Sequence, residues 1–144
     1  VFPACNLLMG LPEWGLPLLY AAIGAVAEEF FCRGFLFTLL KRKNRYLAAV
    51  VSSAVFGLLH LLNLGSVPLW HILLQMAAAF SVGFALSGVL WRTKKLWLCI
   101  VCHLLINLTG HAALSPLGVG LSMACIFIYA FLGILLLRKK EGLL

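Results

Sequence analysis

A few polar side chains interrupt otherwise apolar segments of this chain, and their types suit a hydrolytic site. In sequence order they are Glu28, Glu29, Arg33, His60, His103 and Asn107. Carboxylates and imidazoles activate water as general bases, and imidazole and amide N–H groups stabilise the oxyanion of an attacked carbonyl. If the fold brings these groups together, we expect a site that performs hydrolysis.

Glu28 is the predicted general base of this site. Glu29 and Arg33 stand four residues apart on one helical face, so they are expected to pair and to fix helix packing. Glu28 points about 100° away around the same helix and has no obvious local partner there. A carboxylate in an apolar site suits general-base catalysis, so Glu28 is predicted to deprotonate a water molecule.

Two further pairs of residues lie one helical turn apart. Phe56 and His60 share one face, and His103 and Asn107 share another. His60 is predicted to position the water or to carry a proton, with Phe56 supporting it. His103 and Asn107 are predicted to donate hydrogen bonds to the oxyanion. A single His in an apolar helix is more often a core residue, but polar groups on three segments favour function.

A metal site is the alternative that the same residues leave open. Glu28, His60 and His103 would be its ligands, because two His and one carboxylate form a hydrolytic zinc set. The sequence contains no H-E-x-x-H element. Since it does not separate metal chemistry from glutamate chemistry, no metal or other cofactor is assigned.

The elements that must position these groups are membrane helices. The 144 residues are 64% hydrophobic and 10% charged, whereas soluble domains carry about 25% charged residues. This composition excludes a soluble domain and a disordered chain. Apolar runs span residues 16–40, 46–62, 69–91, 96–108 and 117–137. They predict an all-α polytopic membrane bundle of about five transmembrane helices, in a single domain over residues 1–144.

The basic residues predict the orientation of this bundle. Of the 11 Lys and Arg residues, all but Arg33 follow the first, third and fifth runs, and none lies in connections 63–68 and 109–116. The positive-inside rule then places the C-terminus in the cytoplasm. The net charge of +7 therefore reflects topology. No basic stripe with interleaved aromatic residues indicates nucleic-acid binding.

The order E-E-x-x-x-R, F-x-x-x-H and H-x-x-x-N on successive hydrophobic segments resembles the CPBP family of intramembrane proteases. This family includes the CAAX prenyl proteases and the bacterial Abi proteins linked to bacteriocin processing and self-immunity. The resemblance covers roughly residues 15–110. It implies a helical bundle in a bacterial cell membrane, with a chamber open to the cytoplasm. The chain is expected to be the core of a larger family fold, N-terminally truncated or short.

The resemblance also implies roles for the motif residues. Glu28 would activate water with help from His60, and His103 and Asn107 would stabilise the oxyanion. The family was once treated as metal-dependent, and a glutamate mechanism is now favoured. The expected function is an intramembrane endopeptidase acting on a membrane-associated or lipidated peptide, such as a prenylated, leader or signalling peptide. Expected partners are membrane lipids and that substrate. The alternatives are a non-catalytic self-immunity or scaffold protein and a proton-conducting transporter.

Overall fold

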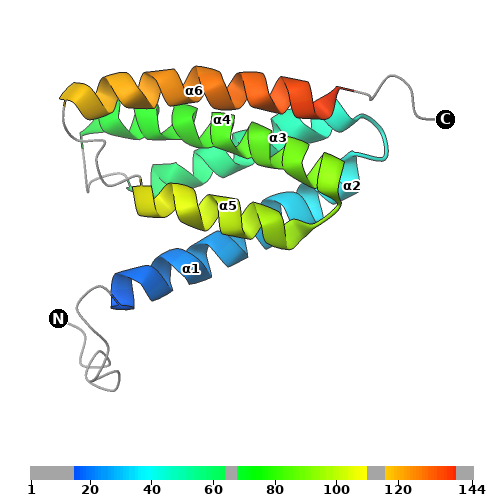
Figure 1. Cartoon of the computed structure of the whole chain (residues 1–144), viewed down its shortest axis with the longest axis horizontal. Helices are drawn as coiled ribbons and strands as arrows, with labels where there is room; N and C mark the ends of the chain where they lie inside the picture. Colours follow the sequence, from blue (N-terminus) through cyan, green and yellow to red (C-terminus); the bar gives the residue numbers. More distant parts are fainter. Residues whose placement is uncertain (1–14, 64–67, 110–115, 139–144) are drawn as a thin grey trace.

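The computed structural model of the chain describes residues 15–63, 68–109 and 116–138 (Figure 1). The helices in these ranges are α1 (Gly15–Glu29), η2 (Phe30–Phe37), α2 (Thr38–Leu40), α3 (Arg45–Leu59), η3 (His60–Asn63), α4 (Leu69–Thr93), α5 (Leu96–Thr109) and α6 (Pro116–Leu137). Because α1, η2 and α2 are continuous, as are α3 and η3, the described residues form five helical rods.

Three of these rods contain segments that are long and apolar enough to cross a membrane. They are Arg45–Leu62, Leu69–Thr93 and Gly120–Leu137, while the apolar part of α5, Leu96–Leu108, is shorter. No strand occurs in the ranges that the structure describes. The prediction of an all-α membrane helix bundle is therefore confirmed. The first rod is the one that carries the buried charges.

The helix ends follow from local sequence. The Asn44 side chain accepts hydrogen bonds from the backbone N–H groups of Tyr46 and Leu47 and caps the start of α3. The end of α4 is a left-handed residue, Lys94, whose φ is 60°. Its N–H bonds to the carbonyl of Leu90, which closes the last turn before α5 begins. These caps set the two turns at one end of the bundle.

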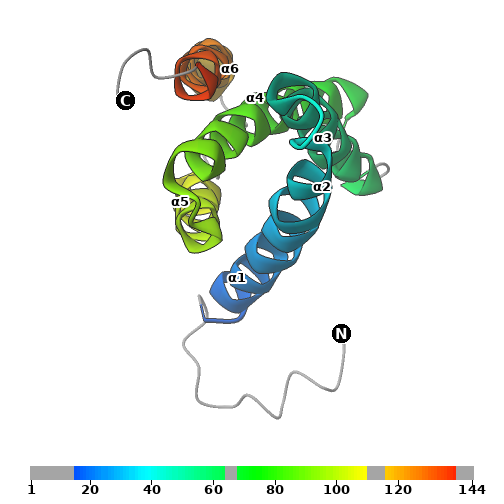
Figure 2. The same cartoon turned by 90° about the vertical axis from the view of Figure 1, so that its right-hand side faces the viewer.

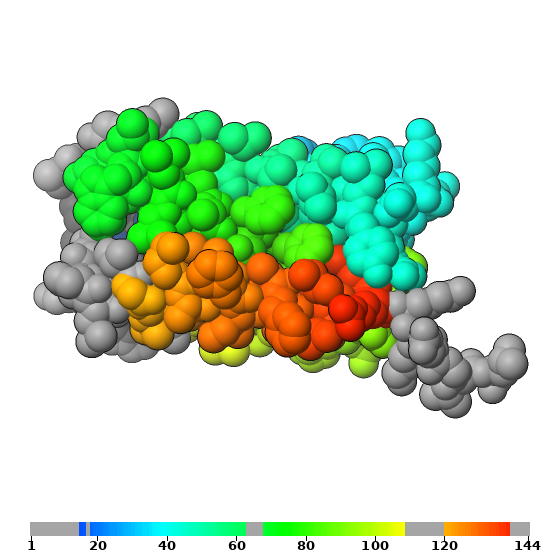
Figure 3. Space-filling view, turned by 90° about the horizontal axis from the view of Figure 1, so that it is seen from above, coloured from blue at the N-terminus to red at the C-terminus, as the bar shows by residue number. Residues whose placement is uncertain are grey.

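Helix α4 is the central element of the bundle. It packs against α3 on one side and α6 on another, while α1 packs against α5. In the end view, the rods from α1 to α5 form a curved row, and α6 lies outside this row against α4 (Figure 2). Figure 3 shows α6 lying along one face of the molecule. Only 11% of its membrane-spanning segment is buried, which is typical of a lipid-facing helix.

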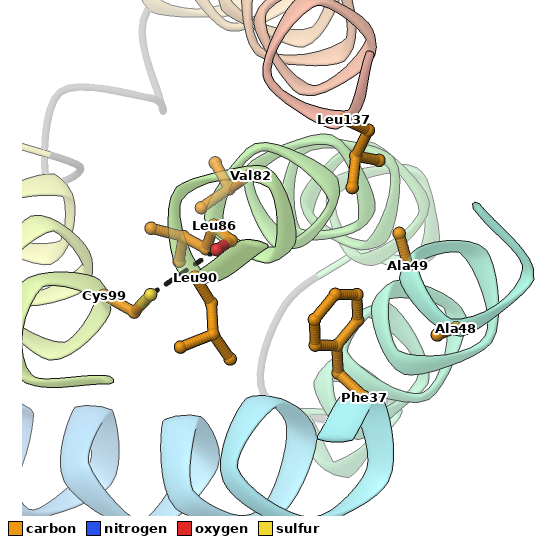
Figure 4. Close-up of a cluster of buried hydrophobic side chains, with 8 residues drawn as sticks. All are labelled: Phe37, Ala48, Ala49, Val82, Leu86, Leu90, Cys99 and Leu137. Carbon is orange, nitrogen blue, oxygen red and sulfur yellow. Dashed lines mark hydrogen bonds between the residues drawn. The ribbon is translucent and has the colours of Figure 1, made fainter. Parts of the chain in front are cut away.

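Small residues allow the close approach of α4 and α6. A Cβ atom added at Gly133 would overlap the ring of Phe84, and one added at Gly88 would lie 2.6 Å from Leu136 Cβ. Beside this contact lies a buried apolar cluster (Figure 4). Its members are Phe37, Ala48, Ala49, Val82, Leu86, Leu90, Cys99 and Leu137. Helix contact in a membrane depends on this kind of packing, because lipid is as apolar as the protein surface.

The first rod departs from the regular helix that its apolar run predicted. Residues Phe30–Phe37 are π-helical, and this segment begins directly after Glu29. The wider turn is stabilised by Thr38, whose hydroxyl donates to the carbonyl of Arg33 at 2.9 Å. The backbone N–H of Thr38 donates to a different carbonyl, that of Phe35. π-helical turns occur often at functional sites, and this one lies beside the candidate site.

The basic clusters gather at one end of the bundle. The α2–α3 connection, the α4–α5 connection and the C-terminal end of α6 lie at this end (Figure 1). Lys139 and Lys140 lie outside the described residues. Arg92 also holds α4 to α6, because its guanidinium donates to the carbonyls of Leu136 at 2.6 Å, Arg138 at 2.9 Å and Leu135 at 3.3 Å. This contact gives Arg92 a structural role that its place in a basic cluster did not indicate.

Candidate active site

The predicted polar residues come from three rods whose packing brings most of them together. Glu28 and Glu29 end α1 and Arg33 follows in η2, while His103 lies in α5. Phe56 lies in α3. Since α1 packs against α5, and η2 packs against α3, these side chains meet inside the bundle.

Glu29 is the centre of this group. Its Oε1 atom lies 3.0 Å from Arg33 Nη1 and 3.0 Å from His103 Nδ1. Both Glu29 and Arg33 are completely buried. The pairing of Glu29 with Arg33 that their spacing predicted is therefore confirmed. The hydrogen bond with His103 also links α1 to α5.

The buried pair is incompletely hydrogen-bonded. Within the described part of the chain, Glu29 Oε2 and the Nε, Nη1 and Nη2 atoms of Arg33 have no hydrogen-bond partner. Arg33 Nη1 is at ion-pair distance from Glu29, but its N–H is not aligned for a hydrogen bond. Burying polar groups without partners is costly, and buried charges are costlier still. Such a cost requires an explanation, which a functional site would supply.

Glu28 differs from Glu29 in its exposure. Its side chain is 36% exposed, and its Oε2 atom lies 3.7 Å from His103 Nε2. Glu28 was expected to lack a local partner, and the structure provides one from a different helix, α5. The two nitrogens of the His103 ring therefore face two different carboxylates, one buried and one accessible.

The hydrogen bonds constrain the proton positions on this ring. A carboxylate only accepts hydrogen bonds, so His103 Nδ1–H donates to Glu29. His103 Nε2 is then the nitrogen that faces Glu28 and any bound molecule. A neutral imidazole has one N–H, and here that N–H is on Nδ1. His103 Nε2 therefore donates a hydrogen bond only when the ring is protonated to the imidazolium. With His103 protonated, the charges of the two carboxylates, Arg33 and His103 sum to zero.

Phe56 supports the charged residues from one side. Its ring centroid lies 4.3 Å from the guanidinium carbon of Arg33, a cation–π contact. The ring also meets the imidazoles of His103 and His60 edge to face, with centroids 5.2 and 5.6 Å apart. Phe56 thus contacts three of the predicted site residues and fixes their relative positions.

Gly83 on α4 is also part of this site. A Cβ atom added there would lie 2.5 Å from Arg33 Nη2 and 3.1 Å from Phe56 Cδ1. Ala79, Gly83 and Ser87 stand four residues apart, and small residues at this spacing allow membrane helices to approach closely. The structure shows that the space left by this glycine holds the guanidinium.

His60 and Asn107 lie at the margin of the group. His60 Nδ1–H donates to the carbonyl of Phe56 at 3.2 Å, so Nε2 is an acceptor when the ring is neutral. In the ranges described, no carboxylate oxygen lies within ion-pair distance of His60. Asn107 lies one turn beyond His103 on α5, and its side chain is exposed. The structure therefore unites Glu28, Glu29, Arg33, Phe56 and His103, with His60 and Asn107 beside them.

The candidate zinc ligands do not form a metal-binding group. Among the described residues, no three His, Cys, Asp or Glu side chains are close enough together to hold a metal ion. Glu28 and His103 are near each other, but His103 also bonds to Glu29 through its second nitrogen. Catalytic zinc sites commonly have three protein ligands. The arrangement of Glu28, His60 and His103 does not fit such a site.

The fold and this site define an integral membrane protein with a buried carboxylate–imidazole cluster within a helix bundle. Residues 10–109 match the family described as "Type II CAAX prenyl endopeptidase Rce1-like", and the chain belongs to this family. The resemblance to CAAX prenyl proteases that the motifs carried is therefore confirmed.

A relative in Bacillus subtilis (strain 168) is named "Putative membrane peptidase YdiL". It is 33% identical over 86 residues, which are 59% of this chain. The chain covers 31% of the length of that relative. No solved structure matches the chain significantly.

Proposed function

We propose that this protein is an intramembrane endopeptidase that hydrolyses a peptide bond in a membrane-associated or lipidated peptide. The observation that carries the proposal is the place of His103 between two carboxylates, with Nδ1 on buried Glu29 and Nε2 facing Glu28. Membership in a family described as endopeptidases supports the same reaction.

Glu28 is the general base in this proposal. A general base must reach the water whose proton it takes, and Glu28 is the accessible carboxylate of the pair. Glu29 is completely buried, and its Oε1 atom contacts both Arg33 and His103. Glu29 and Arg33 therefore act as positioning residues, which hold the His103 ring with Nε2 toward the reaction.

The reaction proceeds in two steps. Glu28 takes a proton from water, and the hydroxide adds to the carbonyl carbon of the peptide to give a tetrahedral oxyanion. His103 as the imidazolium donates to this oxyanion from Nε2, and the exposed amide of Asn107 donates a second hydrogen bond. Glu28 then returns its proton to the amine nitrogen as the C–N bond breaks.

His60 acts on the water rather than on the oxyanion. Because its Nδ1–H is committed to Phe56, its Nε2 accepts a hydrogen bond when the ring is neutral. An acceptor orients one O–H of the water, while Glu28 takes the other proton. This mechanism uses no metal ion, in keeping with the poor fit of the zinc ligand set.

The proposal includes a location and an orientation. The protein resides in a bacterial cell membrane, and the Bacillus relative supports a bacterial origin. Its C-terminus is cytoplasmic, because the basic connections gather at the end of the bundle where α6 ends (Figure 1). The substrate is a peptide or protein that is reached from that side, such as a prenylated, leader or signalling peptide.

The two other functions have less support. A non-catalytic self-immunity or scaffold protein would not require the Glu28–His103–Glu29 arrangement, and the comparisons name peptidases. A proton-conducting transporter would show altered proton flux in liposomes when Glu28 is changed to Gln. An endopeptidase shows altered cleavage instead.

A panel of membrane peptides incubated with the purified full chain in liposomes tests the proposal. We expect defined products from the wild type and a loss of about 100-fold or more in His103→Gln. His71→Gln, which removes an imidazole on α4 outside the cluster, is the matched control and should cleave normally. Equal cleavage by His103→Gln and the wild type would contradict the proposed role of this residue.

A further inference from the structure

Two cations at the basic end of the bundle lie against one indole ring, that of Trp91. Lys94 Nζ lies 4.0 Å from the centroid of the Trp91 ring, and the guanidinium carbon of Arg45 lies 5.4 Å from it. Lys41, from the turn after α2, is near enough to Lys94 for their charges to interact. These residues, Lys41, Arg45, Trp91 and Lys94, form what we call the basic collar.

The collar is held in place by the backbone and by its neighbours. Lys94 is in the left-handed conformation, and its N–H bonds to Leu90, so its side chain leaves a defined turn. Arg45 stacks on Tyr46, with 4.9 Å from its guanidinium carbon to the ring centroid. The Nε atom of Arg45 is buried and has no hydrogen-bond partner in the described ranges.

Within the described ranges, no acidic side chain forms an ion pair with these cations. The only acidic residues in the described ranges are Glu28 and Glu29, which lie 12 and 11 residues before Leu40 in the first rod. Burial lowers the pKa of Lys41, and the positive charges of Lys94 and Arg42 lower it further. A bound anion would relieve this repulsion.

The surroundings of the collar favour an anion that is attached to an acyl chain. The outer face of α3 beside Arg45 presents Tyr46, Leu47 and Val50, which are all exposed. Apolar side chains on this face suit contact with lipid chains, while the collar lies at the start of α3, where the membrane-spanning segment begins. Basic pockets between transmembrane helices bind anionic headgroups in this way.

We propose that the basic collar is a binding site for a phosphate group, presented by the headgroup of an anionic phospholipid. The phosphate oxygens accept from Arg45 and Lys94, and the Trp91 ring forms the floor beneath these cations. The site is separate from the carboxylate–imidazole cluster, so the proposal does not depend on the endopeptidase function.

Thermal unfolding of the purified full chain in mixed micelles tests this site. Phosphatidylglycerol is titrated into phosphatidylcholine micelles, and the half-saturating mole fraction for the rise in Tm is measured. Lys94→Asn removes one charge but tolerates the left-handed backbone. We expect it to need about five-fold more phosphatidylglycerol than the wild type, the factor expected for one interfacial cation. Lys95→Asn is the matched control, with the same net charge and an exposed position outside the collar.

Two further variants and a titration with inorganic phosphate complete the test. Arg45→Gln should weaken the rise in Tm with phosphatidylglycerol by a similar factor, without altering the turn at Lys94. Lys94→Arg keeps the positive charge and should respond like the wild type. Inorganic phosphate in phosphatidylcholine micelles should leave Tm unchanged. Equal responses of Lys94→Asn and Lys95→Asn would overturn the site, because the effect would then follow net charge. A rise in Tm with inorganic phosphate equal to that with phosphatidylglycerol would overturn the lipid as the source of the phosphate.

Discussion

The Nδ1 atom of His103 lies 3.0 Å from the Oε1 atom of Glu29, although 74 residues separate them in the sequence. This contact ties α5 to α1 inside the bundle and fixes the rotation of the imidazole ring. Because Glu29 also contacts Arg33, the ring is held by a buried ion pair rather than by a single flexible side chain. The accessible carboxylate, Glu28, then faces a nitrogen whose direction is already set.

Breaking the buried pair should destabilise the protein strongly. Arg33→Met leaves the Glu29 carboxylate buried without its cation, so the free energy of unfolding should fall by about 3 to 5 kcal/mol. The double variant Glu29→Gln/Arg33→Met should recover most of this loss, because neither charge then remains unpaired. Denaturant titration in micelles measures both values and that of Glu29→Gln alone. Losses that simply add in the double variant would contradict the pairing.

Gly83→Ala should disturb the site without changing any charge. The added methyl would lie 2.5 Å from Arg33 Nη2 and 3.1 Å from Phe56 Cδ1, so the guanidinium must shift. We expect a loss of about 1 to 3 kcal/mol in the free energy of unfolding, together with slower peptide cleavage. Gly24→Ala is the control, since a Cβ atom there meets nothing within 4 Å. Identical behaviour of the two variants would show that Gly83 does not make room for Arg33.

Arg92 should contribute to stability through its bonds to the end of α6. Arg92→Met removes hydrogen bonds to the carbonyls of Leu135, Leu136 and Arg138. Hydrogen bonds to charged groups contribute about 1.5 to 3 kcal/mol each when buried, and partial exposure reduces this. We expect a total loss of about 1 to 3 kcal/mol by the same titration. Lys95→Met changes an exposed side chain and should leave the free energy of unfolding almost unchanged. An equal loss in both variants would contradict the role of Arg92 in holding the end of α6.

Metal chelation should leave cleavage unchanged. The described residues offer no group of three metal ligands, and the proposed reaction needs only Glu28, His60, His103 and Asn107. Cleavage is measured after dialysis against a chelator, with a known zinc protease in the same buffer as a control that loses activity. Loss of cleavage that zinc restores would support the metal alternative instead.

Local features of this structure could be predicted from the sequence because they depend on periodicity. The five apolar runs correspond to the five rods, and the spacing of Glu29 and Arg33 predicted their ion pair. Both follow from helix geometry within one segment. The basic residues predicted which connections share an end, and the cytoplasmic orientation of that end remains a prediction.

Other features could not be predicted because they depend on how the rods pack. The contact of His103 with Glu29 requires the register between α1 and α5, which neither segment determines alone. The π-helical turn shifts the rotation of everything after Glu29, and no residue type signals it. The place of Phe56 against Arg33 likewise depends on α3 meeting η2. The roles of His60 and Asn107 remain predictions.

The most direct test of the account is the rate of peptide cleavage by Glu28→Gln in liposomes. This change keeps the size of the side chain but removes the base, so cleavage should fall by about 100-fold to 10,000-fold. The Tm should stay close to the wild-type value, because Glu28 is partly exposed and is not part of the buried pair. Wild-type cleavage by a folded Glu28→Gln variant would contradict the proposal that Glu28 activates the water.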